Sequence, residues 1–360
     1  MFLTGIGTAT PAPRYTKAQC WEAFQQSEWF ARLDSRAHAV VRTVLQRDNG
    51  IEARRLALSS LEQVFQIDPD TLHRRFLAAA PELATRAGAA ALQDAGLAVA
   101  EIDAVVVSTC TGYLCPGLSG YVIEQLGLAS NVQAFDLVGQ GCAAALPNMR
   151  LGDALLQAGQ CRHVLSICVE VSSAAMYLDN DPGVLVSACL FGDGAGAAVL
   201  SGSASERGRD RRGSQRRRLA WTDCESLIGP GEREALMFQQ RQGMLRNILT
   251  PAVPRLAAQY VQRVLDTVLA RAGLSIAQIS AWIVHAGGRD VLLSMQQQLA
   301  LPDGSFAHSA AALREYGNLS SAFVYFVLQA ALADNAPGGW WWLTSFGAGF
   351  SCHGALLRAD

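Results

Sequence analysis

Hydrophobic residues follow two spacings along this chain, and the spacing changes around Cys142. Residues 132–139, VQAFDLVG, form the short apolar run of a buried strand. Residues 142–159, CAAALPNMRLGDALLQAG, carry Ala and Leu at helical spacing and end in glycine, which predicts a helix. Gly139 and Gly141 allow a tight turn between the two. The pattern therefore predicts strand, turn and helix, with Cys142 in the first helical turn.

Two roles fit Cys142 at this position. A helix N-terminus offers free backbone N–H groups and the positive end of the helix dipole, and both favour a thiolate. A small cysteine among glycines and alanines can equally fill a gap in a core. The local sequence leaves both roles open, so other parts of the chain have to decide between them.

Two segments half a chain apart resemble each other. Residues 95–110, AGLAVAEIDAVVVSTC, align without a gap with residues 272–287, AGLSIAQISAWIVHAG, at an offset of 177 residues. Seven of the first thirteen positions are identical, and both segments predict the end of a helix, a loop and a buried strand. Residues 338–349, GGWWWLTSFGAG, similarly predict a buried strand equivalent to residues 163–170, HVLSICVE. The repeat indicates a duplicated α/β unit whose halves pack face to face.

The duplication brings three chemically useful residues to equivalent element ends. Adding the same offset of 177 to position 142 gives position 319, which is next to Asn318. Asn318 lies in YGNLSSAFVYFVLQAAL, which predicts a Gly turn followed by an apolar helix. His285 ends the second-half strand AWIVH, where the first half has Ser108. Strand ends and helix starts are where open α/β sheets carry their chemistry. We therefore expect Cys142, His285 and Asn318 to converge.

The two halves divide near residue 218. Residues 201–219, SGSASERGRDRRGSQRRRL, are polar, carry seven arginines and are interrupted by Gly and Ser, which predicts an exposed loop. We expect an N-terminal half over 1–218 with the nucleophilic Cys and a C-terminal half over 219–360 with the His and Asn. A basic docking site for an acidic carrier protein is the less favoured interpretation of this loop.

The composition argues against nucleic-acid binding, membrane spans and metal sites. The chain has 360 residues, 50% of them hydrophobic and 17% charged, and a net charge of −2, which predicts a compact protein with no nucleic-acid partner. No apolar run is long enough to span a membrane, and the first residues do not resemble a signal peptide, so a cytoplasmic location is expected. Nine unpatterned cysteines without a His cluster predict reduced thiols and no metal site.

The three residues suit one kind of chemistry. A Cys–His pair is the basic arrangement for a thiolate nucleophile, because the imidazole lowers the thiol pKa. Asn in place of a carboxylate supplies a neutral donor, which suits a polarised carbonyl oxygen or an enolate. Each residue alone is more often structural than catalytic, so the hypothesis depends on all three meeting.

The segments that carry these residues resemble those of the type III polyketide synthases, the branch of the thiolase superfamily that includes chalcone and stilbene synthases. GQGCAAAL is similar to the family's nucleophile segment, WIVHAGGRDVL to its His-Pro-Gly-Gly segment and YGNLSSAFVYFVL to its Tyr-Gly-Asn-x-Ser-Ser segment. The resemblance covers nearly the whole chain. It implies an α/β, thiolase-like fold in which two duplicated αβαβα halves form a five-layered core.

The same resemblance implies a substrate site and a homodimer. STCTGYLCPGL is similar to the loop that crosses the dimer, which places Cys115 in the partner's cavity and Cys110 and Thr111 beside the substrate. Ser320, in the Asn318 segment, would also contact the substrate.

Further segments imply a gate and a tunnel mouth. LFGDGAGAAVL is similar to the segment with the gatekeeper Phe, here Phe191. NGIEARR is similar to the basic segment at the CoA tunnel mouth, so Arg54 and Arg55 are either phosphate contacts or ordinary exposed charges. Met237 would occupy a position where chalcone synthases carry Gly, which would shorten the pocket.

The resemblance implies decarboxylative Claisen condensation. An acyl-CoA starter would load onto Cys142, malonyl-CoA would extend it, and the product would cyclise to a pyrone, a resorcinol or a related aromatic, without metal or redox cofactor. Two departures concern backbone shape: Ala286 replaces the usual Pro, and SFGAGF replaces Gly-Phe-Gly-Pro-Gly. An initiating ketoacyl-ACP synthase is one alternative, although Gly288 stands where those enzymes carry Asn. A catalytically inactive thiolase-fold partner is another, although none of the three residues is missing.

Overall fold

The computed structural model describes residues 1–203 and 217–360, so most of the Arg-rich segment predicted to join the halves lies outside the described residues. Nine strands form one sheet in the order β11-β12-β13-β8-β1-β7-β6-β4-β5. The strands of the first half are β1 (Phe2–Ala9), β4 (Ala104–Ser108), β5 (Gln133–Leu137), β6 (His163–Val171) and β7 (Asp193–Ser201). Those of the second are β8 (Leu219–Ile228), β11 (Ile279–Val284), β12 (Gly339–Gly347) and β13 (Ser351–Ala359).

Strand pairing repeats between the halves. β4 pairs parallel with β6, and β6 and β7 continue antiparallel to β1. β11 pairs parallel with β12, and β12 and β13 continue antiparallel to β8. The two segments that resemble each other in sequence end in β4 and β11, so they occupy equivalent places in the two patterns. The division at 218 stays a prediction, and β8 begins directly after it.

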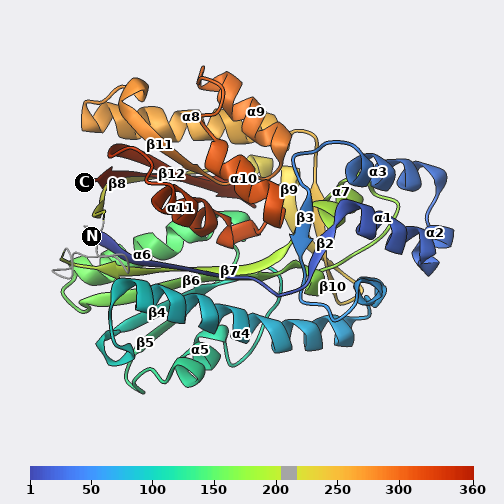
Figure 1. Cartoon of the computed structure of the whole chain (residues 1–360), viewed down its shortest axis with the longest axis horizontal. Helices are drawn as coiled ribbons and strands as arrows, with labels where there is room; N and C mark the ends of the chain where they lie inside the picture. The colour runs from blue at the N-terminus through green and yellow to red at the C-terminus, as the bar shows by residue number, and fades with distance from the viewer. Residues whose placement is uncertain (204–216) are drawn as a thin grey trace.

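Helices and strands alternate in five layers, as the resemblance implied (Figure 1). One outer layer contains α8 (Val253–Ala272), which packs on β8 and β13, together with α9 (Arg289–Gln298). The opposite outer layer contains α4 (Pro69–Ala95), which packs on β1, β6 and β7, together with α5 (Leu118–Leu126). Between the strands of the two halves lie α6 (Ala145–Gln157) and α11 (Phe323–Ala333), and each contacts strands of both halves.

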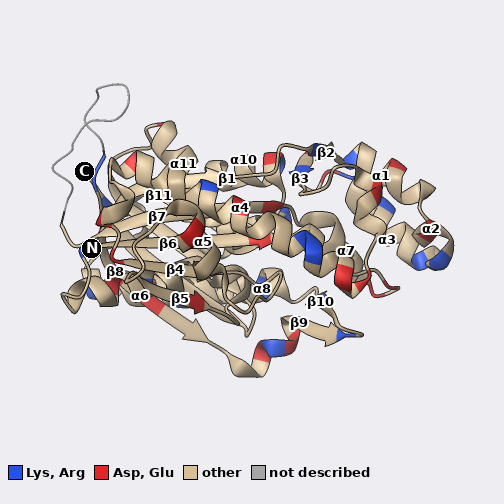
Figure 2. Cartoon of the chain, turned by 90° about the horizontal axis from the view of Figure 1, so that it is seen from below, with Lys and Arg blue, Asp and Glu red and all other residues tan. Residues whose placement is uncertain are grey.

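Most of the remaining elements surround the end of the molecule away from both termini (Figure 1). They are α1 (Lys17–Gln26), α2 (Glu28–Arg32), α3 (Ser35–Gln46), α7 (Pro182–Leu190), α10 (Ala307–Tyr316), β2 (Arg14–Thr16), β3 (Ala53–Arg55), β9 (Leu236–Arg241) and β10 (Met244–Leu249). Figure 2 shows Lys and Arg interspersed with Asp and Glu over α1 to α3. Within residues 1–203 and 217–360, no helix combines the length and apolar character needed to cross a bilayer.

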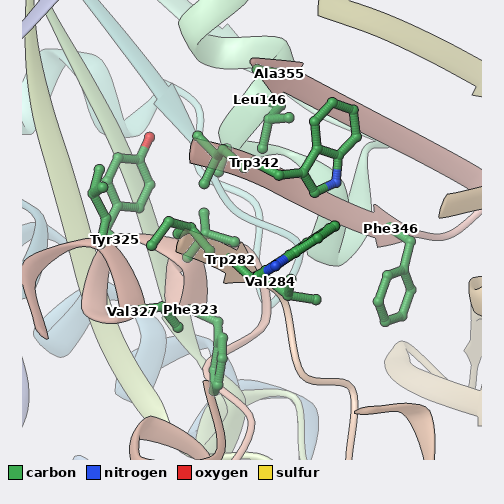
Figure 3. Packing of buried hydrophobic residues seen from close by; sticks show 14 of the residues in the cluster. Leu146, Trp282, Val284, Phe323, Tyr325, Val327, Trp342, Phe346 and Ala355 are labelled. Carbon is green, nitrogen blue, oxygen red and sulfur yellow. The ribbon is translucent and has the colours of Figure 1, made fainter. Parts of the chain in front are cut away.

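Aromatic side chains fill the space between the middle helices and the C-terminal strands. Trp341 and Trp342 are fully buried on β12, as the sequence predicted for this run. Figure 3 shows Trp342, Trp282, Phe323 and Phe346 as members of one cluster of buried hydrophobic residues. This packing fixes the ends of β11 and β12, from which residues of the site project.

Two predictions around Cys142 were wrong in detail. The strand predicted as buried is β5, which lies at the edge of the sheet with alternating half-buried and exposed residues, because only β4 flanks it in the described chain. The helix predicted to start at Cys142 is divided: a 3₁₀ turn, Gly141–Ala143, precedes α6. Cys142 therefore lies in a tight turn before the helix, where the chain enters the space between the halves.

Candidate active site

The turn that carries Cys142 is packed against the end of β12. A Cβ atom on Gly347 would lie 2.6 Å from the backbone N of Ala143 and 3.0 Å from that of Cys142, so only glycine fits there. Ser345 donates a hydrogen bond to the carbonyl oxygen of Ala143 at 2.9 Å. The SFGAGF segment thus holds the Cys142 turn in place without the family's proline.

Cys142, His285 and Asn318 line one cavity of about 520 Å³, called the Cys142 cavity below. The three side chains are nearly inaccessible to solvent, with exposed fractions of 7%, 1% and 2%. They reach the cavity from the turn before α6, the end of β11 and the turn before α11. The convergence expected from the repeat is therefore present. Other lining residues include Arg47, Asp48, Asn49, Leu190, Phe191, Gly287, Gly288, Arg289, Asp290 and Phe346.

The side chain of Asn318 is held at both ends of its amide. Its Oδ1 accepts from the backbone N–H of Ser320 at 2.8 Å, and its Nδ2 donates to the carbonyl oxygen of Gly287 at 3.1 Å. These partners fix which end of the amide is the donor. Because an amide nitrogen carries two hydrogens, one remains available for another acceptor.

The imidazole of His285 lies between two aromatic rings. The ring centres of Phe323 and Phe346 are 5.5 Å and 5.0 Å from it. Its Nδ1 is buried without a hydrogen-bond partner in the described chain, so no carboxylate fixes the tautomer. Ala286, in place of the family's proline, is fully buried directly after it.

Burial keeps both reactive groups neutral. It raises the pKa of the Cys142 thiol to about 12 and lowers the pKa of His285 to about 3. The hydrogen bond donated by Ser320 to the sulfur lowers the thiol pKa but is outweighed, and the nearby Glu170 raises it further. The sequence predicted an imidazole that lowers the thiol pKa, whereas burial shifts the pKa of Cys142 in the opposite direction.

Ser320 connects Cys142 to a second thiol. Its hydroxyl donates to Sγ of Cys142 at 3.1 Å and lies 3.3 Å from Sγ of Cys110. Glu170, on β6, accepts from the backbone N–H of Cys110 at 3.1 Å and from the hydroxyl of Thr111 at 3.0 Å. Three of the predicted substrate contacts therefore form one buried network next to the nucleophile.

Phe191 lines the Cys142 cavity and also a small void of about 30 Å³ that Cys110, Thr111 and Ser320 line. It is therefore common to the two spaces, and its role as a gate stays a prediction. Met237 lies elsewhere, on β9, where it lines a hollow of about 670 Å³ together with Cys110 and Thr111. It does not line the Cys142 cavity, and a shortening of the substrate pocket by Met237 stays a prediction.

Cys115 is exposed in the loop between β4 and α5. Tyr113 in the same loop and Val138 after β5 are 73% and 65% exposed. Cys115 does not line the chain's own Cys142 cavity, and its contact with a partner stays a prediction.

The structure does not bring Arg54 and Arg55 to the Cys142 cavity. The guanidinium of Arg54 is buried and donates to backbone carbonyls, whereas Arg55 donates to Glu315 at 3.1 Å and to the carbonyl oxygen of Ala12 at 3.0 Å. The arginines that line the cavity are Arg47 and Arg289.

Sequence reasoning missed these two arginines and Glu170. Arg289 follows two glycines at the start of α9, which is a signal for an anion-binding helix start. Glu170 is an acid within the apolar run of β6, and a charge in a buried strand is itself a signal. In the described residues, no three His, Cys, Asp or Glu side chains are grouped so that they could hold a metal ion.

Comparisons with known proteins agree along the whole chain. Residues 9–216 match the family described as FAE1/Type III polyketide synthase-like protein, and residues 227–359 match the C-terminal domain of chalcone and stilbene synthases. A 1,3,6,8-tetrahydroxynaphthalene synthase of Streptomyces peucetius subsp. caesius is 30% identical over 99% of this chain and 92% of its own. A 3,5-dihydroxyphenylacetyl-CoA synthase of Streptomyces toyocaensis is 28% identical over 99% of this chain and 89% of its own.

Solved structures give the same answer. PKS-I from the brown alga Ectocarpus siliculosus superimposes with a TM-score of 0.88 and 26% identity, over 99% of this chain and 98% of that one. The 1,3,6,8-tetrahydroxynaphthalene synthase from Streptomyces coelicolor A3(2) shares the fold, with a TM-score of 0.84 at 22% identity over 99% of both chains. With matched segments that together span both halves, this chain belongs to the type III polyketide synthases, which are condensing acyltransferases of the thiolase fold.

Proposed function

We propose that this enzyme carries a starter acyl group on Cys142 and extends it with malonyl-CoA by decarboxylative Claisen condensation. One observation carries the proposal: Cys142, His285 and Asn318 line a single cavity although they come from both halves. A nucleophile, a base and a neutral donor in one site are the groups this reaction needs.

In the loading step, the sulfur of Cys142 attacks the thioester carbonyl of the starter. The S–acyl bond forms, the acyl–CoA bond breaks, and the thiol proton passes through the imidazole of His285 to the departing CoA sulfur. Both groups start in the protonation states that this course needs, because a neutral thiol has a proton to give and a neutral imidazole can accept it.

In the extension step, malonyl-CoA loses CO₂ and the electron pair of the broken C–C bond becomes an enolate. The free amide hydrogen of Asn318 and a ring N–H of His285 stabilise its oxygen. The enolate carbon attacks the acyl-Cys142 carbonyl and releases the thiol, so the acyl chain on CoA is two carbons longer. Repetition gives a polyketide that cyclises; the names of the bacterial relatives indicate aromatic products, which supports a pyrone, a resorcinol or a related aromatic.

The CoA portion of both substrates would lie between Arg47 and Arg289, which line the Cys142 cavity from different elements. Guanidinium groups bind phosphates bidentately, and the free N–H groups at the start of α9 favour the same anion. Asp48, which pairs with Arg289 at 3.1 Å, would have to release it when phosphate binds.

The test is product formation from labelled malonyl-CoA with a panel of acyl-CoA starters, followed by mass spectrometry. Cys142→Ala should abolish product while keeping the fold, and Cys168→Ala, which changes a buried cysteine on β6 outside the cavity, should not. Near wild-type product from Cys142→Ala would contradict the acyl-Cys142 intermediate. A single extension that requires malonyl-ACP would favour the ketoacyl-ACP synthase alternative.

A further inference from the structure

Arg54 is a buried cation whose guanidinium meets the end of a helix. It is 6% exposed, and its Nη1 donates to the carbonyl oxygens of Ala188 at 2.8 Å and Phe191 at 3.0 Å. Ala188 lies in the last turn of α7, and Phe191 is its C-cap. The last carbonyls of a helix lack intrahelical partners and carry the negative end of its dipole, so a buried arginine satisfies both there.

The residues that follow α7 hold Asn318. The backbone N–H of Asn318 donates to the carbonyl oxygen of Leu190 at 2.9 Å, and the N–H of Gly192 donates to the carbonyl oxygen of Asn318 at 2.9 Å. These two bonds form an isolated parallel bridge between Phe191 and Asn318. The position of the Asn318 backbone therefore depends on where α7 ends.

The stem of Arg54 touches the other side of this bridge. Gly317 has φ +70°, and a Cβ atom on it would lie 2.9 Å from Cγ of Arg54 and 2.7 Å from the carbonyl oxygen of Leu190. Arg54 thus contacts the end of α7 through its head and the residue before Asn318 through its stem.

We infer that Arg54 is a positioning residue for Asn318: it caps α7, fixes the backbone bridge between Phe191 and Asn318, and so aims the amide of Asn318 into the Cys142 cavity. This inference rests on the proposed function, in which that amide stabilises the malonyl-CoA enolate. It replaces the expected role of Arg54 as a phosphate contact.

The test compares Arg54→Met and Arg54→Lys with the wild type. Arg54→Met keeps the stem and removes the donors, so malonyl-CoA decarboxylation should fall tenfold or more in kcat, since a small misplacement of a catalytic group costs about this much. Alkylation of Cys142 by iodoacetamide should change less than twofold. Arg54→Lys keeps the charge and one donor group, so its decarboxylation should lie between the two, and it serves as the test variant if Arg54→Met does not fold.

A double-mutant cycle separates positioning from general stability. In an Asn318→Ala background, Arg54→Met should lower the rate of decarboxylation by less than about threefold further, because its effect passes through Asn318. Arg75→Met is the matched control: Arg75 is half-buried and, like Arg54, donates to backbone carbonyls, those of Ser173 and Gln63. It should lose no more than twofold in decarboxylation.

The inference would be overturned if Arg54→Met lowered decarboxylation equally in both backgrounds, or if Arg75→Met lowered it as much as Arg54→Met does. Full activity of Arg54→Met or of Arg54→Lys would overturn it as well. A crystal structure of the Arg54 variant gives a readout besides activity. The Nδ2 of Asn318 should leave the carbonyl oxygen of Gly287, and an unchanged bond would overturn the inference as well. Absence of CO₂ release by the wild type would contradict the proposed function instead. The crystal structure would still test whether Arg54 positions Asn318.

Discussion

The hydroxyl of Ser320 donates a hydrogen bond to the sulfur of Cys142 at 3.1 Å, from the other half of the chain. Both residues lie in short 3₁₀ turns, Gly141–Ala143 and Ser320–Ala322, which occupy equivalent places in the two halves. The bond is a favourable contact for the thiolate in a site where burial disfavours it. It therefore influences how readily the sulfur reacts.

Removal of this bond should slow Cys142. Ser320→Ala deletes a donor that lowers the thiol pKa, so iodoacetamide alkylation at pH 8 should slow about fivefold, the equivalent of one hydrogen bond of about 1 kcal/mol. The rate is measured on the Cys142 peptide by mass spectrometry, which separates it from exposed Cys115. Ser321→Ala is the control, because the hydroxyl of Ser321 donates to Glu170 and not to the sulfur. An unchanged or faster rate in Ser320→Ala would contradict this role.

Acid should destabilise the fold through two buried histidines. Burial lowers the pKa of His285 to about 3 and that of His353 to about 4, and Arg150 contributes to the second shift. The unfolded chain takes up these protons near pH 6.5, so their contribution is complete above that pH and is lost as the pH falls below it. Between pH 7 and 5, each histidine should remove about 2 kcal/mol from the free energy of unfolding.

Urea denaturation at pH 7 and pH 5 checks this expectation. The free energy of unfolding of His353→Gln should fall by about 2 kcal/mol less than that of the wild type over that interval, because glutamine cannot take up the proton. Buried acids such as Glu170 respond in both proteins and cancel in the comparison. The same pH dependence in both would show that His353 is not protonated on unfolding.

Assembly as a homodimer is the third prediction. β5 has a neighbour on one side only in the described chain, and Tyr113 and Val138 are exposed beside it. An open strand edge with exposed apolar side chains favours association. Light scattering at micromolar concentration should give a dimer, and Tyr113→Ser with Val138→Ser should weaken it.

Ile228→Ser is the control for this pair, because Ile228 is also 60% exposed but lies at the end of β8 in the other half. A monomeric wild type, or equal weakening by the control, would count against an interface at β5.

The sequence predicted the convergence of Cys142, His285 and Asn318 because the internal repeat encodes which element ends are equivalent. The pairing of β4 with β6 and of β11 with β12 follows from the same repeat. Local patterns also predicted the buried Trp341 and Trp342. These features depend on order along the chain, which the sequence contains directly.

Other features depend on contacts between segments that are far apart in the sequence, and local patterns do not reveal these contacts. The exposure of β5 follows from its place at the sheet edge, and apolar composition alone does not give that place. The pKa of Cys142 depends on burial by residues from both halves, so the local helix signal predicted the wrong direction. The sequence does not distinguish Arg54 from a surface arginine, because only the folded structure shows that it contacts the end of α7.

The last prediction separates the work of His285 from that of Asn318. Both act on the malonyl oxygen in the proposed mechanism, so His285→Ala and Asn318→Ala should each lower CO₂ release from malonyl-CoA about a hundredfold or more. Only His285 also accepts the thiol proton, so starter loading should slow in His285→Ala and stay within threefold of wild type in Asn318→Ala. Because burial keeps thiol and imidazole neutral, Cys142 alkylation should rise steadily from pH 6 to 9 in all three proteins. A wild-type alkylation plateau near neutral pH that disappears in His285→Ala would instead establish a preformed thiolate–imidazolium pair, and normal CO₂ release by Asn318→Ala would remove Asn318 from the enolate site.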